Sequence, residues 1–263
     1  PLFLCHGMPG CRLLHHPDPS IARALDVRVI VPDRPGMGLS DVQPRRSILD
    51  WSADLLALAD ALEIDRFAVI GLSAGAPYAA ACGTSLGDRV STIGLVSGVS
   101  PLEAPGAMDG MLSTNRIGYA VGRRMPWPLW RRVFALYYGD VPAHPEKLVD
   151  LDEEEASADQ AVLVDSGVRP ILLHTFAEAF RQGAAGPARD AWLLTRPWGF
   201  ALEHVAVPVH LWQGEADVVV TPAMARHMAR HLPQCQARFL PGEGHLLWVT
   251  HWEEILATVA DAT

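Results

Sequence analysis

Cysteine is scarce in this chain, with four residues among 263. The four lie far apart and form no C-x-x-C pair, which argues against a zinc knuckle and against a thioredoxin-like redox site. Four cysteines are also too few for a disulfide scaffold in a chain of this length. We therefore expect free thiols, buried or half-buried, in a protein of the reducing cytoplasm; they are Cys5, Cys11, Cys82 and Cys235.

Positive charge is also in short supply. Lysine and arginine together number 21 against 30 aspartate and glutamate residues, so the formal net charge is −9 at pH 7, and Lys147 is the sole lysine. Proteins that bind the phosphates of nucleic acids present a basic face, which this composition does not favour. Nucleic acid is therefore not an expected partner.

Long uncharged segments are few, and residues 67–87 form the longest. Its length would suit a membrane span, but glycine, serine and proline interrupt it, and its first third has the pattern of a strand. We therefore predict no membrane span. No signal peptide is visible, and the chain begins inside a strand-like run without a methionine, so we expect natural residues before Pro1.

Apolar residues are plentiful, at 49% of the chain, which is enough for a large core. At this length one large domain, or one domain with an insertion, is the expected organisation. Six short apolar runs end at loop residues such as glycine and proline, as strands buried on both faces of a parallel sheet do. The runs lie at residues 2–5, 27–31, 67–71, 93–96, 207–212 and 237–240.

Helical patterns separate these runs, with apolar or alanine-rich faces at spacings of three and four residues. Thr221 precedes a proline and is a good candidate for a helix N-cap. Alternating strands and helices predict an α/β fold with a doubly wound, mostly parallel sheet. The helices are expected at residues 48–62, 74–86, 222–232 and 252–259.

Strand signals nearly vanish between residues 103 and 205. Three helices are expected there, at residues 108–124, 128–138 and 162–182, and the acidic run 150–155 has the pattern of a solvated helix face or loop. We predict that residues 1–102 and 206–263 form the α/β core and that residues 103–205 form an inserted helical cap.

Residues 71–75 read G-L-S-A-G, which fits the G-x-S-x-G pattern between a strand and a helix. The chain must turn sharply there, so Ser73 is expected in a strained conformation with its hydroxyl exposed, and the glycines leave room where Cβ atoms would clash. The pattern alone is weak, but the flanking strand and helix supply the context that a nucleophilic serine requires. An idle serine in a tight turn is the alternative.

A nucleophilic serine needs a base and an acid that orients the base. His245, between glycines after the last strand-like run, is the candidate base, and Asp217, after the preceding run, is the candidate acid. Glu215 competes with Asp217, and Glu103 or Asp109 is a less favoured third choice. The order serine, acid, histidine matches one of the known orders of such triads.

The negative oxygen that forms during acyl transfer needs hydrogen-bond donors. The backbone N–H of Ala74, which follows the serine, is one candidate. The N–H of Met8, in the H-G-M-P-G loop after the first run, is the other, because Pro9 has no N–H. A plain Pro-Gly turn is the alternative interpretation of this loop.

The glycine-rich segment 33–38 does not fit a nucleotide-binding loop. A G-x-G-x-x-G pattern would need glycine where Asp41 stands, and no Gly-Lys-Ser/Thr sequence exists in the chain. We interpret this loop as structural, with Ser40 and Asp41 capping a turn.

Five motifs together resemble the α/β-hydrolase superfamily, in the right order and across nearly the whole core. The resemblance implies Ser73 as nucleophile, Asp217 as acid, His245 as base and a lid over the site. The family usually has two strands before the first motif, and here they are absent. The motifs are H-G-M-P-G at 6–10, D-R-P-G-M-G-L-S at 33–40, G-L-S-A-G at 71–75, G-E-A-D at 214–217 and G-E-G-H at 242–245.

These residues predict a serine hydrolase that cleaves a carboxylic ester, or a related acyl bond, of a small apolar substrate through an acyl-enzyme. No cofactor or metal is expected, and the partner is a small molecule. The same triad could instead serve carbon–carbon bond hydrolysis, an aminopeptidase, or cofactor-free perhydrolase or haloperoxidase chemistry, and a non-catalytic ligand receptor is a further alternative.

Aromatic residues of the cap are expected partly to pack the cap, as for Tyr137 and Tyr138, and partly to face the site. Trp248 is expected to pack under the histidine loop.

Overall fold

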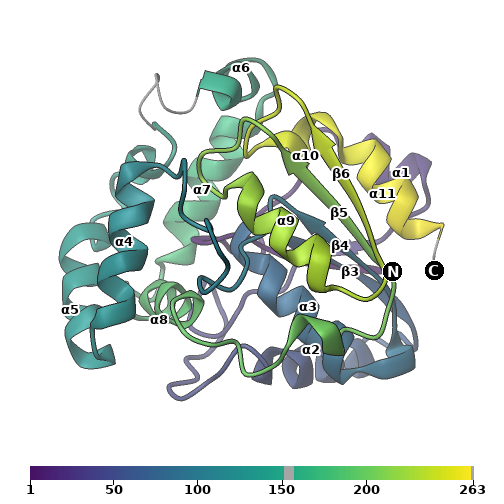
Figure 1. The fold of residues 1–263 in the computed structure, drawn as a ribbon, viewed down its shortest axis with the longest axis horizontal. Coiled ribbons are helices and arrows are strands. Elements are labelled where there is room, and N and C mark those ends of the chain that lie inside the picture. Colours follow the sequence, from purple (N-terminus) through teal and green to yellow (C-terminus); the bar gives the residue numbers. More distant parts are fainter. Residues whose placement is uncertain (151–156, 262–263) are drawn as a thin grey trace.

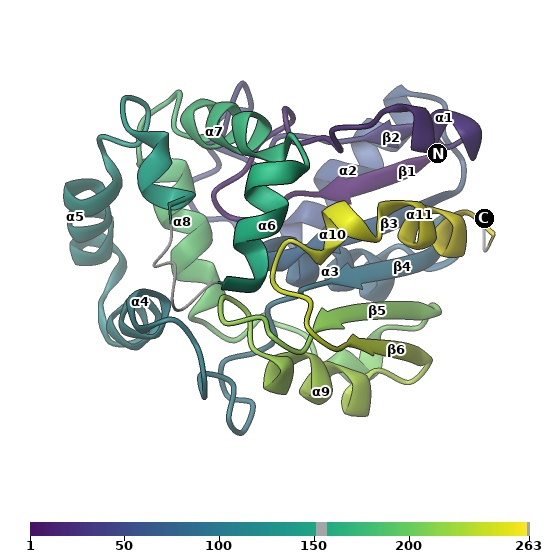
Figure 2. The same ribbon diagram turned by 90° about the horizontal axis from the view of Figure 1, so that it is seen from above.

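The fold is built on one parallel sheet of six strands (Figure 1), in the order β2-β1-β3-β4-β5-β6, which can be followed in Figure 2. We describe a computed structural model, which covers residues 1–150 and 157–261. Every neighbouring pair of strands is parallel, which confirms the predicted α/β class. The strands are β1 Leu2–Cys5, β2 Val29–Ile30, β3 Phe67–Leu72, β4 Val90–Val96, β5 Val209–Gly214 and β6 Cys235–Leu240.

Helices connect the strands and cover both faces of the sheet. Helices α2, α3 and α9 lie on one face, and α1 and α11 lie on the other (Figures 1 and 2). The helices outside the segment between β4 and β5 are α1 Ser20–Ala24, α2 Asp50–Ala61, α3 Ala76–Ser85, α9 Pro222–His231, α10 Leu247–Thr250 and α11 Trp252–Ala260.

The core is split by the sheet into two apolar layers. In β1, Phe3 and Cys5 face the layer under α2 and α3, whereas Leu2 and Leu4 face the layer under α11. This alternation follows from the two-residue period of a strand, and it explains why a continuous apolar run is needed. Burying each large side chain contributes about 1.5–3 kcal/mol of hydrophobic stabilisation.

Within the residues that the structure describes, five α-helices lie between β4 and β5 in the sequence, and we call them the inserted helices. They gather beyond the carboxyl ends of the strands (Figure 2). They are α4 Ser113–Arg124, α5 Trp127–Tyr138, α6 Ser157–Asp165, α7 Val168–Ala179 and α8 Ala185–Leu194. Of the acidic run expected as a solvated helix face or loop, residues 151–155 lie outside the described residues.

The helix predictions differ from the structure in several details. The single helix expected at residues 162–182 is broken into α6 and α7, because Gly167 between them has a left-handed backbone with φ +75°. The predicted N-cap Thr221 does precede α9, but its hydroxyl donates to the carbonyl of Ala107 instead of capping the helix. The helix expected at residues 108–124 begins only at Ser113, and helices α1, α8 and α10 were not predicted.

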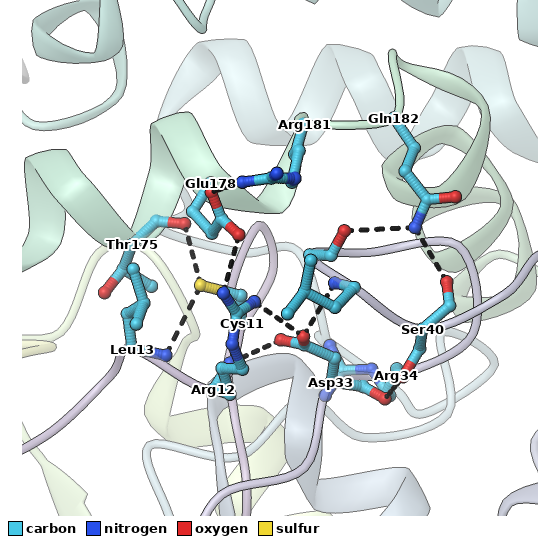
Figure 3. Close-up of polar contacts among 12 residues, drawn as sticks. Cys11, Arg12, Leu13, Asp33, Arg34, Ser40, Thr175, Glu178, Arg181 and Gln182 are labelled. Atoms are coloured by element: carbon cyan, nitrogen blue, oxygen red, sulfur yellow. Dashed lines mark hydrogen bonds and ion pairs between the residues drawn. The ribbon is translucent and has the colours of Figure 1, made fainter.

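Polar contacts tie the inserted helices to the loop after β2 (Figure 3). Arg12 bridges Asp33 in that loop and Glu178 of α7, with both ion pairs at 2.8 Å. Gln182, just after α7, donates to the carbonyl of Ser40 at 2.8 Å. The loop therefore holds the inserted helices in place, as well as forming its own turn.

The turn itself is capped mainly by Asp33. Its carboxylate accepts the N–H of Leu39 at 2.9 Å, and its carbonyl accepts the hydroxyl of Ser40 at 2.9 Å. Ser40 thus has the predicted structural role. The side chain of Asp41, which was also expected to cap the turn, is exposed, and Asp33 caps the turn in its place.

None of the helices within residues 1–150 and 157–261 combines the length and the apolar character that a bilayer crossing demands.

Candidate active site

Ser73 lies at the sharp turn between β3 and α3. Its φ is +52°, a left-handed value that costs about 1–3 kcal/mol for a residue other than glycine. Close packing holds the turn: a Cβ on Gly75 would lie 2.0 Å from the carbonyl oxygen of Cys5, and one on Gly71 would lie 2.7 Å from the Cα of Ala76. Glycine at both positions is therefore a steric requirement of the turn.

The structure brings Ser73, His245 and Asp217 together in one hydrogen-bonded line. The Oγ of Ser73 lies 3.1 Å from Nε2 of His245, and Nδ1 of His245 lies 2.9 Å from Oδ2 of Asp217. The three residues come from loops after β3, β5 and β6, which end at the same edge of the parallel sheet. The fold thus makes neighbours of Ser73 and His245, which are 172 positions apart in the sequence.

The carboxylate of Asp217 is buried, and both of its oxygens accept hydrogen bonds. Its Oδ1 accepts the N–H groups of Val219 and Val220, both at 2.9 Å, and Nε2 of Gln213 donates to Oδ2 at 3.1 Å. These bonds offset the cost of burying a carboxylate and fix the direction of the oxygen that meets His245.

The competing acids take other positions. Glu215 is exposed and pairs with Arg226 at 3.3 Å, while Glu103 and Asp109 are exposed in the loop after β4. Asp217 is the acid that contacts Nδ1 of His245.

Asp159 of α6 is a second buried acid beside the histidine. Its two oxygens accept the backbone N–H groups of His245 at 3.0 Å and Leu246 at 2.7 Å, so it clamps the loop that carries the imidazole. The hydroxyl of Ser97 holds the same loop from the sheet, donating to the carbonyl of His245 at 3.1 Å. No motif in the sequence marked Asp159, because its partners lie 86 and 87 positions away.

Two carboxylates set the charge environment of His245. Burial lowers the pKa of His245, but the charge and hydrogen bond of Asp217 and the charge of Asp159 together outweigh it, so the resulting pKa lies above its ordinary value. Burial also raises the pKa of Asp159. The imidazole is therefore a stronger base than a free histidine.

The two backbone groups predicted to hold a negative oxygen adjoin Ser73. Ala74 is buried directly after it, and Met8 lies in the loop after β1, lining the same cavity. This loop comes very close to the serine, since a Cβ on Gly7 would lie 3.5 Å from Cβ of Ser73.

Two cavities have Ser73 in their lining. The larger has a volume of about 460 Å³ and is also lined by His245, Asp159 and Leu246. The smaller has a volume of about 170 Å³ and is lined by Ala74 but not by His245. Both are bounded by the inserted helices, and the smaller is the more aromatic, with Tyr119, Trp130, Phe134, Tyr138 and Phe180 in its wall.

The aromatic residues of the insertion divide between packing and lining, as expected. The ring of Tyr138 packs at a tilted angle against Phe134, with ring centroids 4.7 Å apart, and lines both cavities. Tyr137 was expected to pack but is 72% exposed, because it lies on the outer face of α5. Trp248, which was expected to pack under the histidine loop, packs edge-on against Trp252 and also lines the larger cavity.

Metal ligands do not gather here: across the part of the chain that the structure describes, no group of three or more histidine, cysteine, aspartate or glutamate side chains is arranged to hold a metal ion.

Comparisons with known proteins agree with this architecture. The model of the alpha/beta hydrolase family matches residues 2–258. The uncharacterized hydrolase YcgS of Bacillus subtilis is 23% identical over 232 residues, which are 84% of this chain and 76% of that protein. An esterase from Thermogutta terrifontis has a similar structure, with a TM-score of 0.66 and 22% identity over 99% of this chain and 88% of the esterase. A bromoperoxidase from Bacillus anthracis is also similar, with a TM-score of 0.66 and 20% identity over 98% of this chain and 89% of that one. The chain belongs to the α/β-hydrolase family.

Proposed function

We propose that this protein is a serine hydrolase that cleaves a carboxylic ester, or a related acyl bond, of a small apolar substrate. The observation that carries the proposal is the line of hydrogen bonds from Ser73 through His245 to Asp217, which opens onto a cavity. A strained serine, a histidine of raised basicity and a buried carboxylate are the groups that nucleophilic acyl transfer requires.

The reaction proceeds through an acyl-enzyme. Ser73 Oγ attacks the substrate carbonyl while His245 Nε2 takes its proton, and Asp217 stabilises the imidazolium that forms. The N–H groups of Met8 and Ala74 hold the negative oxygen of the tetrahedral intermediate. His245 then gives its proton to the leaving alcohol, and a water molecule releases the acid by the same steps in reverse.

The two cavities suggest how the substrate lies. The leaving group must be close to Nε2 of His245, because it receives the proton from there, and His245 lines only the larger cavity. We therefore assign the alcohol to the larger cavity and the acyl group to the smaller, aromatic one. Residues 103–205 act in this proposal as the cap that shapes both.

The similarity to a bromoperoxidase favours perhydrolysis as a second candidate activity. In that reaction hydrogen peroxide replaces water in the attack on the acyl-enzyme and releases a peracid. The residues and their roles are otherwise the same.

The test is labelling with a fluorophosphonate probe, combined with turnover of p-nitrophenyl esters of increasing acyl length, amides and lactones. We expect stoichiometric labelling at Ser73 and a preference for short apolar acyl groups, and Ser73→Ala should lower kcat by about 10⁶-fold. Ser85→Ala, at the exposed end of α3, is the matched control and should label and turn over normally.

Ester turnover by the Ser73→Ala variant at the wild-type rate would contradict the proposal. Absence of labelling in the folded wild-type protein would favour the receptor alternative instead. Peracid formed from hydrogen peroxide and an ester, at a rate above ester hydrolysis, would favour the second candidate.

A further inference from the structure

A buried cluster of charged residues lies behind the loop that carries Met8. Its members are Arg34 from the loop after β2, Arg46, Tyr78 of α3 and Asp190 of the inserted helix α8. The side chains of Arg34 and Asp190 are both 0% exposed. Burial of ions at this depth is costly unless every donor and acceptor is used.

Asp190 is the centre of this cluster. Its Oδ2 accepts Nε of Arg34 at 2.8 Å, and its Oδ1 accepts the hydroxyl of Tyr78 at 2.7 Å and a hydrogen bond from Arg46. Burial alone would raise the pKa of Asp190, but Arg34 and Arg46 lower it below its ordinary range, so the carboxylate stays charged. The guanidinium of Arg34 is thereby held in one orientation.

The remaining donors of Arg34 reach the Met8 loop, and one of them, Nη2, also pairs with Oδ2 of Asp190 at 2.6 Å. Nη1 donates to the carbonyl of His6, and Nη2 donates to the carbonyl of Gly7 at 3.0 Å. A planar guanidinium with fixed donors can hold two carbonyls and a carboxylate at once, which a lysine cannot do.

His6 adds a second donor to the Gly7 carbonyl. Burial, together with the charge of Arg34, lowers the pKa of His6 to about 3, so the ring is neutral. Its Nε2 accepts the backbone N–H of Arg34 at 3.4 Å, which leaves the proton on Nδ1 to donate to the Gly7 carbonyl at 2.8 Å.

The Gly7 carbonyl and the Met8 N–H belong to one peptide plane. This bond is trans, so the oxygen and the N–H point in opposite directions, and holding one fixes the other. We propose that Arg34, anchored by Asp190, is a positioning residue that aims the Met8 N–H at the negative oxygen formed on Ser73. This inference rests on the proposed function, and it makes α8 a support of the reacting site.

The test compares Arg34→Lys with wild type in ester turnover and in binding of phenylboronic acid. The serine oxygen adds to boron, and the resulting tetrahedral boronate mimics the transition state. We expect kcat to fall by about 10²–10³-fold, as when one donor to the oxyanion is lost, with KM nearly unchanged and boronate affinity lower by a similar factor.

Arg12→Lys is the matched control. Arg12 also bridges the core and an inserted helix, but its ion pairs go to Asp33 and Glu178 and none of its hydrogen bonds reaches His6 or Gly7. This variant should melt at a lower temperature and keep the kcat and boronate affinity of wild type.

A second variant covers the case in which Arg34→Lys does not fold. Asp190→Asn keeps the shape of the anchor and removes its charge, so a folded Asp190→Asn protein should lose kcat and boronate affinity together, with KM retained. The inference is overturned if either folded variant keeps wild-type kcat and boronate affinity, or if Arg12→Lys loses them equally. Those outcomes leave the proposed function intact, because that depends on Ser73.

Discussion

At the residue scale, the charges around His245 make a prediction about pH. The pKa of this histidine is raised above its ordinary value by Asp217 and Asp159, and a base must be unprotonated to accept a proton. The rate should therefore fall as the pH drops through this raised pKa, so we expect the acid limb of kcat/KM to have its midpoint above about 6.5.

Asp159→Asn should move that acid limb to lower pH, because it removes a negative charge that favours the imidazolium. It should also lower kcat, because the amide nitrogen of asparagine cannot accept one of the two N–H groups of the histidine loop that the Asp159 carboxylate holds. The measurement is a pH profile of ester turnover. Glu253→Gln, exposed on α11, removes the same charge far from the site and should leave the profile in place. An unmoved acid limb in folded Asp159→Asn would contradict the prediction.

At the element scale, the docking of α8 depends on two glycines. A Cβ on Gly186 would lie 2.0 Å from the carbonyl oxygen of Gly36, so the start of α8 and the loop after β2 touch through their backbones. Gly36 has φ +83°, a conformation that suits glycine. This contact lets Asp190, one turn further along α8, reach Arg34.

Gly186→Ala should therefore destabilise the protein by about 1–3 kcal/mol through overpacking, which corresponds to a melting temperature several degrees lower. Gly118→Ala in α4 is the control, and it should raise the stability instead of lowering it. The added methyl group there would meet no atom within 4 Å, and alanine is favoured over glycine in a helix by up to about 1 kcal/mol. Thermal denaturation measures both, and equal melting temperatures for Gly186→Ala and wild type would refute the close contact.

The elements differ in how well local sequence predicted them. Strands β1, β3 and β4 were found because they are buried at every residue, and burial on both faces favours an apolar run. The edge strand β6 is not a continuous apolar run, since it contains the exposed residues Gln236 and Arg238, and it was found from the apolar residues that remain. The break between α6 and α7 was missed because a single glycine within an apolar helical pattern is tolerated in many helices. Helix α8 was missed because its Ala-Gly-Pro start and its buried aspartate do not form an amphipathic pattern.

At the scale of the whole molecule, burial protects the thiols. All four cysteines are free, and burial raises the pKa of Cys5 and of the half-buried Cys235 to about 11 each. The thiolate is the reactive form, so little of it is present at pH 8.

We expect a disulfide reagent such as DTNB to react slowly with the native protein and to find four thiols once the protein is unfolded in denaturant. Cys235 should react first in the native state, because it is the one cysteine that is not fully buried. Cys235→Ser should remove that first phase. A fast stoichiometric reaction that persists in the folded variant would show that another thiol is accessible.

Local patterns predicted the sheet, and they selected Ser73, Asp217 and His245 as candidates, whose side chains lie in one hydrogen-bonded line. Each of these lies in a short motif at the end of a strand, and parallel strands bring such ends to one edge whatever the details of packing. Fold class and candidate residues therefore follow from features that neighbouring residues in the chain share.

Tertiary structure alone decided which side chains support that site. Asp159 contacts His245, which is 86 positions away in the sequence, and Arg34 contacts Asp190, which is 156 positions away. Neither contact can therefore be predicted from the residues next to either partner. The same holds for the aromatic residues that line the two cavities rather than pack between helices. Their roles depend on how the inserted helices dock on the core, and docking is a property of packing between distant segments rather than of any local sequence.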